Sequence, residues 1–374
     1  MSGSETISLC LIVRDEEATL PSCLGSVRDL VDECVVLDTG STDRTVAVAR
    51  RFDCRVYAEP WRDDFAHARN AAFAHATGDW IFWLDADDVL LPPDRERFQA
   101  LRHTLDGTVN GYTMVYDYAR DAHGSPWLRF RLPRVVRRVA AWRWVGRVHE
   151  YLEGPGPVAA ADVIVTHDRH RSSGDRNLRI YQAMEQAHEP FTPRDRLYYA
   201  NELADHQRWV DALPLYEQVA ADPAVWCEDR LWALHKLAEG YHARGDRIAM
   251  RRAVYRSFDL DAPRPEACCR LGWDALQRSA WREAAGWYEC ATRAGVPDTG
   301  GFRLEACHTW LPHVQLAVCL TPLGELAHAA WHNERAARWV PADPHVRHNR
   351  RWFRSQGIQP EGVGPCVLRP GLRP

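Results

Sequence analysis

Three carboxylates stand directly after a strongly apolar stretch of the sequence. Residues Trp80 to Leu84 are apolar or aromatic, and Asp85, Asp87 and Asp88 follow at once. The apolar run is too short for a helix and predicts a fully buried strand. Two acids at positions i and i+2, with a third beside them, can hold a hard divalent cation, which could bridge the phosphates of a nucleotide. A solvated acidic loop that caps the next helix is the alternative.

The elements that must position these acids alternate between strand and helix. Apolar runs predict strands, and helical spacing or alanine-rich composition predicts the helices between them: strands 7–13, 34–38, 54–57 and 80–84, helices 20–30, 43–51 and 65–76. This alternation predicts a parallel, doubly wound α/β sheet, in which right-handed crossovers bring the strand ends to one edge. We therefore expect Arg14-Asp15, Asp38-Thr39 and Asp85-Ala86-Asp87 to converge there. The sequence has no GxGxxG and no P-loop, which disfavours a dinucleotide dehydrogenase and a P-loop enzyme.

Composition narrows the class of protein. The chain has 374 residues, enough for two domains, and a net charge of −4, which gives no general attraction to nucleic acid or anionic membranes. Its 11 cysteines are scattered without any CxxC, which argues against a zinc module and a secreted disulfide framework. The sequence contains no apolar run of 18 residues, so no transmembrane segment is predicted. The N-terminus lacks the apolar core of a signal peptide. The expected location is the cytoplasm.

Four ordered motifs resemble those of the inverting GT-A glycosyltransferases of family 2. They cover the region from about Ile7 to Arg179 and read SLCLIVRDEE from Ser8, VLDTGSTDRT from Val36, ARNAA from Ala68 and LDADD from Leu84. The resemblance implies an α/β fold with a GT-A (Rossmann-like) mixed sheet. It also implies a nucleotide-sugar donor, usually a UDP-sugar, with Mg²⁺ or Mn²⁺ as cofactor.

The resemblance also implies roles for individual residues. Asp38 and Thr39 would lie by the uracil, Arg69 by the base and diphosphate, and Asp85 by the ribose. The residues expected to bind the nucleotide-sugar are Val13, Arg14, Glu16, Asp38, Thr39, Gly40, Arg69, Asp85 and Ala86. The expected metal ligands are Asp87, Asp85 and His167. Relatives usually carry Asn where this chain has Asp15, which adds a negative charge near the diphosphate.

An inverting transfer needs a general base that takes the proton of the acceptor as it attacks the sugar. His149 and Glu150 follow a Trp-rich segment, and a Trp-lined pocket could raise a carboxylate pKa toward working pH. Asp88 is the rival base. The alternative for Glu150 is an ion pair with a nearby arginine, such as Arg143 or Arg147. The alternative for His167 is a capping or core histidine.

From about Arg179 onward, strand signals vanish and helical periodicity takes over. Four pieces share a similar pattern of small and large residues, beginning near Tyr199, Leu237, Leu271 and Leu316. They resemble tetratricopeptide repeats, although a generic helical bundle predicts nearly the same core. The expected domains are a catalytic domain at 1–178, an all-α tetratricopeptide-like domain at 179–356, and a disordered tail at 357–374.

This layout resembles the SunS-like peptide S/O-glycosyltransferases. The resemblance implies a metal-dependent inverting transferase that moves a hexose from a UDP-sugar to a Cys, Ser or Thr side chain of a peptide or protein. One alternative is a transferase that builds a lipid-linked or lipopolysaccharide-type glycan. An alternative from another class is a helical-repeat scaffold with an inactive sugar site. The expected partners are a peptide or protein acceptor and a second copy bound through the helical domain, with no nucleic acid.

Overall fold

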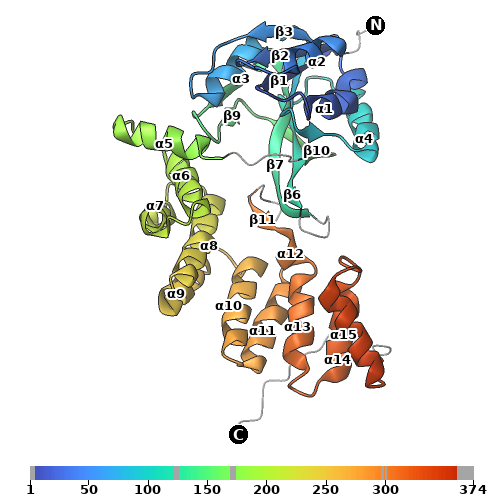
Figure 1. Cartoon of the computed structure of the whole chain (residues 1–374), viewed down its shortest axis with the longest axis vertical. Helices are drawn as coiled ribbons and strands as arrows, with labels where there is room; N and C mark the ends of the chain where they lie inside the picture. The colour runs from blue at the N-terminus through green and yellow to red at the C-terminus, as the bar shows by residue number, and fades with distance from the viewer. Residues whose placement is uncertain (1–4, 121–125, 169–173, 296–298, 300, 360–374) are drawn as a thin grey trace. The chain divides into compact units, whose positions relative to one another are not determined.

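The computed structural model describes residues 5–120, 126–168, 174–295, 299 and 301–359 (Figure 1). Contacts divide the chain into two compact units. The first holds Met1–Ala119 and Arg129–Glu202, and the second holds Arg120–Leu128 and Leu203–Pro374. No helix among the described residues is both long enough and apolar enough to cross a membrane.

The first unit is built on a mixed sheet and a separate small hairpin. The strands of the sheet lie in the order β3-β2-β1-β4-β7-β6-β10-β5. The bounds of the strands are β1 Ile7–Val13, β2 Glu33–Asp38, β3 Arg55–Ala58, β4 Trp80–Trp83, β5 Asp88–Val89, β6 Gly111–Arg120, β7 Pro126–Arg137, β8 Arg143–Val145, β9 Tyr151–Glu153 and β10 Val158–His167. The strands β1 to β4 run parallel, and β7 joins β4 antiparallel, which confirms the mixed α/β sheet. The hairpin consists of β8 and β9.

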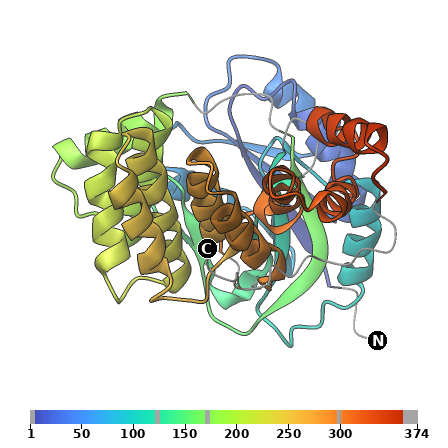
Figure 2. The same ribbon diagram turned by 90° about the horizontal axis from the view of Figure 1, so that it is seen from below.

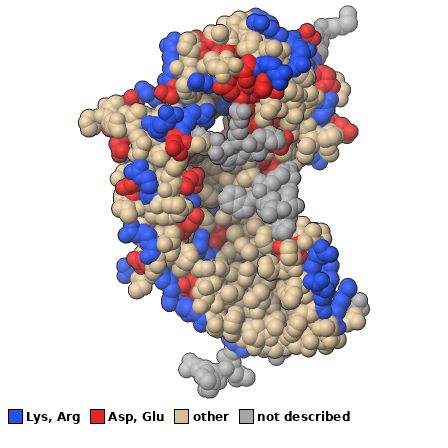
Figure 3. Space-filling view, in the orientation of Figure 1, with Lys and Arg blue, Asp and Glu red and all other residues tan. Residues whose placement is uncertain are grey.

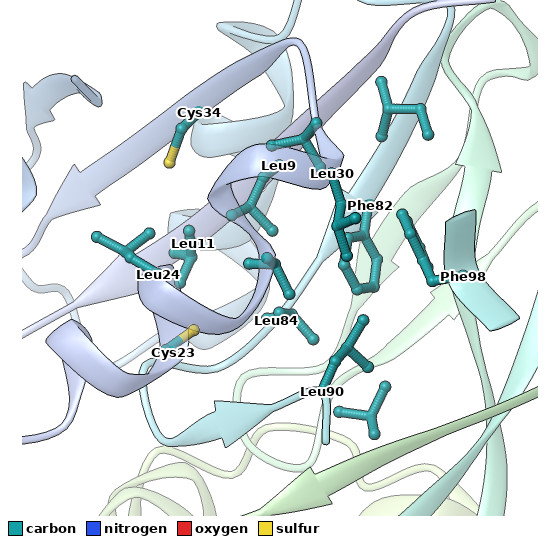
Figure 4. Packing of buried hydrophobic residues seen from close by; sticks show 14 of the residues in the cluster. Leu9, Leu11, Cys23, Leu24, Leu30, Cys34, Phe82, Leu84, Leu90 and Phe98 are labelled. Carbon is teal, nitrogen blue, oxygen red and sulfur yellow. The ribbon is translucent and has the colours of Figure 1, made fainter. Parts of the chain in front are cut away.

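Helices cover both faces of this sheet, as the strand pattern requires. The helices that begin in the first unit are α1 Leu20–Val27, α2 Thr45–Arg51, α3 Phe65–Ala74, α4 Pro92–Arg102, α5 Arg176–Gln186 and α6 Pro193–Asp205. Of these, α1 to α4 contact the strands of the sheet. Alternate residues of each strand face opposite sides. On one side Leu9, Leu11 and Phe82 pack against α1 and α4 (Figure 4). On the other side Ile81 and Trp83 pack against α3 and the β8–β9 hairpin. Both faces are therefore buried, as the apolar strand runs predict.

Strand register brings the expected site segments to one edge. Val13 pairs with Asp38 at the ends of β1 and β2, so the loops that follow these strands start side by side. The short strand β5 pairs antiparallel with β10 and sets His167 opposite Asp88. A close approach also fixes the start of β4, because a Cβ on Gly78 would lie 2.9 Å from the backbone nitrogen of Ser8.

The second unit is helical and contains a short strand, β11. The bounds are α7 Trp209–Ala221, α8 Cys227–Ala243, α9 Arg247–Ser257, α10 Pro265–Gln277, α11 Trp281–Arg293, β11 Arg303–Leu304, α12 Glu305–His308, α13 Leu311–Leu320, α14 Leu326–Ala336 and α15 Pro344–Ser355. Successive helices pack in pairs, α8 on α9, α10 on α11 and α13 on α14, and Figure 2 shows α7, α8 and α9 side by side.

Small residues stand where these helices cross closely. A Cβ on Gly240 would meet the ring of Trp209 at 2.6 Å, and one on Gly272 would meet Tyr288 at 2.9 Å. The helical second unit confirms the all-α region expected from the sequence. The pairing of small with large residues is the packing that helical repeats require. The predicted tail lies outside the described residues from 360 onward.

Candidate active site

The loops after β1 and β2 are joined by hydrogen bonds. Thr39 donates to the carbonyl oxygen of Val13 from its backbone N–H at 2.9 Å and from its hydroxyl at 3.0 Å. Oδ1 of Asp15 accepts the backbone N–H of Thr42 at 2.7 Å, and this bond is the main cause that lowers the pKa of Asp15. Asp15, the residue that departs from the family pattern, therefore links the two loops as a carboxylate.

The other residues expected near the nucleotide lie along the same two loops. Asp38 is buried, and its carboxylate accepts the backbone N–H groups of Ser41 at 3.1 Å and Gly40 at 3.4 Å. Gly40 has φ +107°, a conformation that favours glycine. Arg14 is exposed, while Glu16 donates its N–H to the hydroxyl of Thr45 at 2.7 Å. In Figure 3, acidic side chains gather on the visible face of the first unit, bordered by basic ones.

Arg69 on α3 connects two carboxylates at this edge of the sheet. Its side chain is 9% exposed and forms two ion pairs, from Nη2 to Oδ1 of Asp85 at 2.6 Å and from Nε to Oε1 of Glu150 at 2.5 Å. The guanidinium lies 4.9 Å from the ring centroid of Trp83 and 4.8 Å from that of Trp144. Burial opposes its charge, but the two carboxylates outweigh burial and raise the pKa of Arg69. The same pairing lowers the pKa of Asp85 despite burial.

A second group of ligand atoms lies where β5 meets β10. One carboxylate oxygen each from Asp87 and Asp88 and one ring nitrogen from His167 lie within 4.8 Å of one another. Nδ1 of His167 lies 3.5 Å from Oδ1 of Asp87 and 3.4 Å from Oδ1 of Asp88. Burial is the main cause that raises the pKa of Asp87 to about 6, opposed by His167 and assisted by Asp85 and Asp88. The group therefore concentrates negative charge that a cation would balance.

His167 responds to the same charges. Burial alone would lower its pKa, but contact with Asp88 and the charges of Asp87 and Asp88 outweigh burial and raise it. Its ring also stacks on Tyr118, with centroids 5.3 Å apart. His167 thus lies with the acids, as expected from the sequence, and its partners hold the ring in place.

Asp88 is fully buried and already bonded on both oxygens. Oδ2 accepts from Nη1 of Arg134 at 3.0 Å and from the backbone N–H of Asp85 at 3.0 Å, while Oδ1 accepts from the hydroxyl of Tyr116 at 2.8 Å. Arg134 itself has no exposed surface, and its guanidinium lies 3.9 Å from the ring centroid of Trp83. Asp88 therefore shapes the turn that carries Asp87, and it would have to leave these bonds to accept a proton from an acceptor.

The remaining base candidates lie on the segment after β8. Glu150 has an arginine partner, but it is Arg69; Arg147 instead pairs with Glu189 at 2.9 Å. Nε2 of the neighbouring His149 lies 2.8 Å from Oε1 of Glu202 on α6. Glu202 also accepts from the side-chain amide of Asn177 at 3.0 Å.

Several residues of this site were not predicted from the sequence. They are Tyr116, Arg134, Trp144 and Glu202. The segment around Arg134 alternates arginines with apolar residues. This pattern does not reveal an inward-facing arginine unless it is known which face of the strand is turned toward the core. Asp85, expected also as a metal ligand, contacts Arg69 instead and is not part of the three-residue group.

Comparison with known proteins assigns this part of the chain to a class. Residues 8–130, about a third of the chain, match the model of glycosyl transferase family 2. A stretch of 156 residues is 31% identical to the SPbeta prophage-derived glycosyltransferase SunS of Bacillus subtilis, covering 40% of this chain and 35% of the relative. A stretch of 100 residues is 54% identical to a TPR repeat-containing protein of Synechococcus elongatus, covering 27% of this chain and 24% of the relative.

The chain thus spans only 24% and 35% of the length of these two curated relatives. Among solved structures, glucosyl-3-phosphoglycerate synthase of Mycobacterium tuberculosis in complex with Mn²⁺ and UDP-glucose aligns with 50% of this chain and 81% of its own. That alignment has a TM-score of 0.34 and 19% identity.

Proposed function

We propose that the protein is a metal-dependent, inverting glycosyltransferase that moves a hexose from a UDP-sugar to a peptide or protein side chain, a Cys, Ser or Thr. One observation carries the proposal. The group formed by Asp87, Asp88 and His167 lies two residues from Asp85, which pairs with Arg69. The possible metal ligands and the buried guanidinium of Arg69, a group that can bind phosphate, therefore meet at the turn from Asp85 to Asp88.

Asp87 and His167 would hold the metal, with Asp88 as a neighbouring acid. Carboxylate oxygens suit Mg²⁺ and Mn²⁺, and imidazole is also accepted by Mn²⁺. The raised pKa of Asp87, about 6, fits this role because a bound cation would relieve its repulsion by Asp85 and Asp88. When bound, a metal of this kind stabilises the negative charge of a departing diphosphate.

Arg69 would bind the donor. Its planar guanidinium suits two phosphate oxygens at once, and the rings of Trp83 and Trp144 hold it in place. A diphosphate that takes up this guanidinium competes with its present ion pair to Glu150. Donor binding would therefore release Glu150.

A released Glu150 is the general base that we favour. It would accept the proton of the acceptor thiol or hydroxyl as the acceptor attacks the anomeric carbon and the diphosphate departs. No covalent intermediate with the enzyme is needed, since inversion is a single displacement. Asp88 is the rival, but both of its oxygens are bonded in the core.

The acceptor class is the finer part of the proposal. It is supported by the partial similarity to the glycosyltransferase SunS and by a second unit made of paired helices, a type of surface that can hold an extended chain.

A donor-hydrolysis screen tests the activity. The full chain is incubated with UDP- and GDP-sugars, with Mn²⁺ or with EDTA, and released nucleotide is measured. We expect release from a UDP-hexose that requires the metal and is at least about tenfold slower with EDTA. Equal release in EDTA, or release from no nucleotide-sugar, would contradict the proposal.

A further inference from the structure

A cavity lies in the second unit where α8, α9 and α10 meet. Its apolar wall includes Leu231, Leu234, Val254 and Phe302. It is formed by residues of the helical unit alone and is therefore independent of the carboxylate edge described above. Mostly apolar cavities with a few polar groups are typical of sites for small ligands or single side chains.

The carboxylates in the wall of this cavity already have partners. Glu228 accepts from both terminal nitrogens of Arg264, at 2.9 Å and 2.8 Å. Glu266 lies 2.7 Å from Nε2 of His308 and accepts the backbone N–H of Leu304 at 3.0 Å. These acids are therefore neutralised by their own neighbours.

Two donors in the wall have no such partner. Nε1 of Trp232 is buried and has no hydrogen-bond acceptor among the described residues. Arg270, half-buried on α10, makes no ion pair or side-chain hydrogen bond with any described residue. The ring of His235 stacks on Trp232, with centroids 5.3 Å apart. Burial and the charge of Arg270 lower the pKa of His235 to about 4, so its ring is neutral near pH 7.

The buried, unpaired Nε1–H of Trp232 is costly, and a ligand that supplies an acceptor removes that cost. The half-buried Arg270 can exchange its contacts with water for such a ligand. A guanidinium prefers a carboxylate, which it can bind with two hydrogen bonds. We propose that this cavity binds an organic carboxylate carried on a small apolar or aromatic body, with Arg270 and Nε1–H of Trp232 holding the carboxylate and the apolar wall holding the body.

Two sources share this chemistry. One is the C-terminal carboxylate of a polypeptide that ends in an apolar residue, and the other is a free aromatic or aliphatic acid. The site does not depend on glycosyl transfer, so its failure would leave the proposed activity untouched.

Titration calorimetry with the full chain tests the site, with 3-phenylpropionate as the probe and its neutral amide as the comparison. We expect the acid to bind at least about tenfold more tightly than the amide. Arg270→Gln and Trp232→Phe should each weaken binding of the acid about tenfold, whereas Arg270→Lys, which keeps the charge, should retain part of it. Arg244→Gln, an exposed arginine after α8, should leave binding unchanged.

Equal binding of the acid and the amide would overturn the proposal. So would unchanged binding in Arg270→Gln, or no heat from the acid at about 10 mM. Thermal melts of each variant show whether it is folded; if Arg270→Gln is not, the comparison of Trp232→Phe with the wild type decides.

The source is decided with the peptide Ala-Ala-Phe as its free acid and as its C-terminal amide. Binding of the free-acid peptide about tenfold more tightly than 3-phenylpropionate indicates a polypeptide terminus. Equal affinity of the two acids indicates a free acid. A peptide amide that binds as well as the peptide acid would contradict a carboxylate site.

Discussion

Two buried arginines hold the turn that carries Asp87. Arg69 pairs with Asp85 before it, and Arg134 pairs with Asp88 after it. Both guanidinium groups also lie against the ring of Trp83. The ends of the turn are thus fixed in the core, while Asp87 keeps 27% of its side chain exposed. A ligand held between two anchored neighbours loses little freedom when it binds a cation, which is what a preorganised site requires.

Replacing Glu150 by Gln tests the proposed base. The amide cannot take a proton, so we expect kcat for transfer to fall by about 100-fold or more. KM for the donor should not rise, because the ion pair that the donor must displace from Arg69 is weakened. Steady-state kinetics with donor and acceptor varied separately would measure both. Glu153→Gln, an exposed residue of β9, is the control. If Glu150→Gln leaves kcat unchanged, Glu150 only positions Arg69, and Asp88 becomes the preferred base.

Strand register explains which neighbouring site residues could be predicted from the sequence. The buried strands and their apolar runs place Val13 beside Asp38, and this follows from the strand–helix alternation alone. The pairing of β5 with β10, which sets His167 opposite Asp88, joins segments about 80 residues apart. The sequence indicates His167 only through a family resemblance, because local patterns carry no information on such distant pairing.

The arginine partners of Asp88 and Glu150 also could not be predicted from local sequence patterns. Arg134 meets Asp88 in the core, and Arg69 meets Glu150 across 81 positions of the chain. The sequence predicts that each carboxylate lies near the site, but not which of them is neutralised by an arginine. Small residues against large ones, as in Gly240 on Trp209, repeat locally along the chain, and so the helical repeats could be recognised.

The contact between α13 and α14 gives a prediction for stability. Nδ1 of His313 lies 2.8 Å from Nδ1 of His332, and both side chains are buried. Burial is the main cause that lowers the pKa of His313 to about 4 and that of His332 to about 3. Below about pH 6.5 these histidines are protonated in the unfolded state but stay neutral in the folded state. The stabilisation is therefore complete above pH 6.5 and is lost as pH falls toward 4.

As pH is lowered from 6 to 4, we expect each of these histidines to reduce the free energy of unfolding by on the order of 1 kcal/mol per pH unit. Urea unfolding of the helical unit within the full chain at several pH values would measure this slope. His332→Leu should reduce the slope of the free energy of unfolding against pH by the contribution of about one proton. His348→Gln, at an exposed residue of α15, should leave the slope unchanged. A slope that is the same in His332→Leu and in the wild type would refute this explanation.

For the whole molecule, contacts set the division near Glu202, later in the chain than the predicted boundary at 178. Glu202 bonds His149 and Asn177, so α5 and the start of α6 belong with the first unit. The described residues of the proposed site therefore all lie in the first unit. We infer that the second unit serves the acceptor, and a homodimer through its helices remains a prediction.

A chain that ends after Asp205 tests this division of labour. We expect it to hydrolyse the UDP-sugar within about threefold of the full chain, because every contact of Arg69, Asp87 and His167 described above is retained. Transfer to a peptide acceptor should fall by about tenfold or more. Both rates can be measured by nucleotide release and by mass spectrometry of the peptide. Undiminished peptide transfer by a folded, shortened chain would show that the helices do not carry the acceptor.

We propose that Asp87 binds a metal that in turn binds the nucleotide. The most direct measurement is titration calorimetry of UDP into the full chain, with and without Mn²⁺, for the wild type, Asp87→Asn and the control Asp162→Asn, whose side chain is 93% exposed. We predict that Mn²⁺ tightens UDP binding at least about tenfold in the wild type and the control, and that Asp87→Asn loses this gain while its affinity without metal is unchanged. A gain from Mn²⁺ that is equally large in Asp87→Asn, or no binding of UDP under any condition, would show that Asp87 does not have this role.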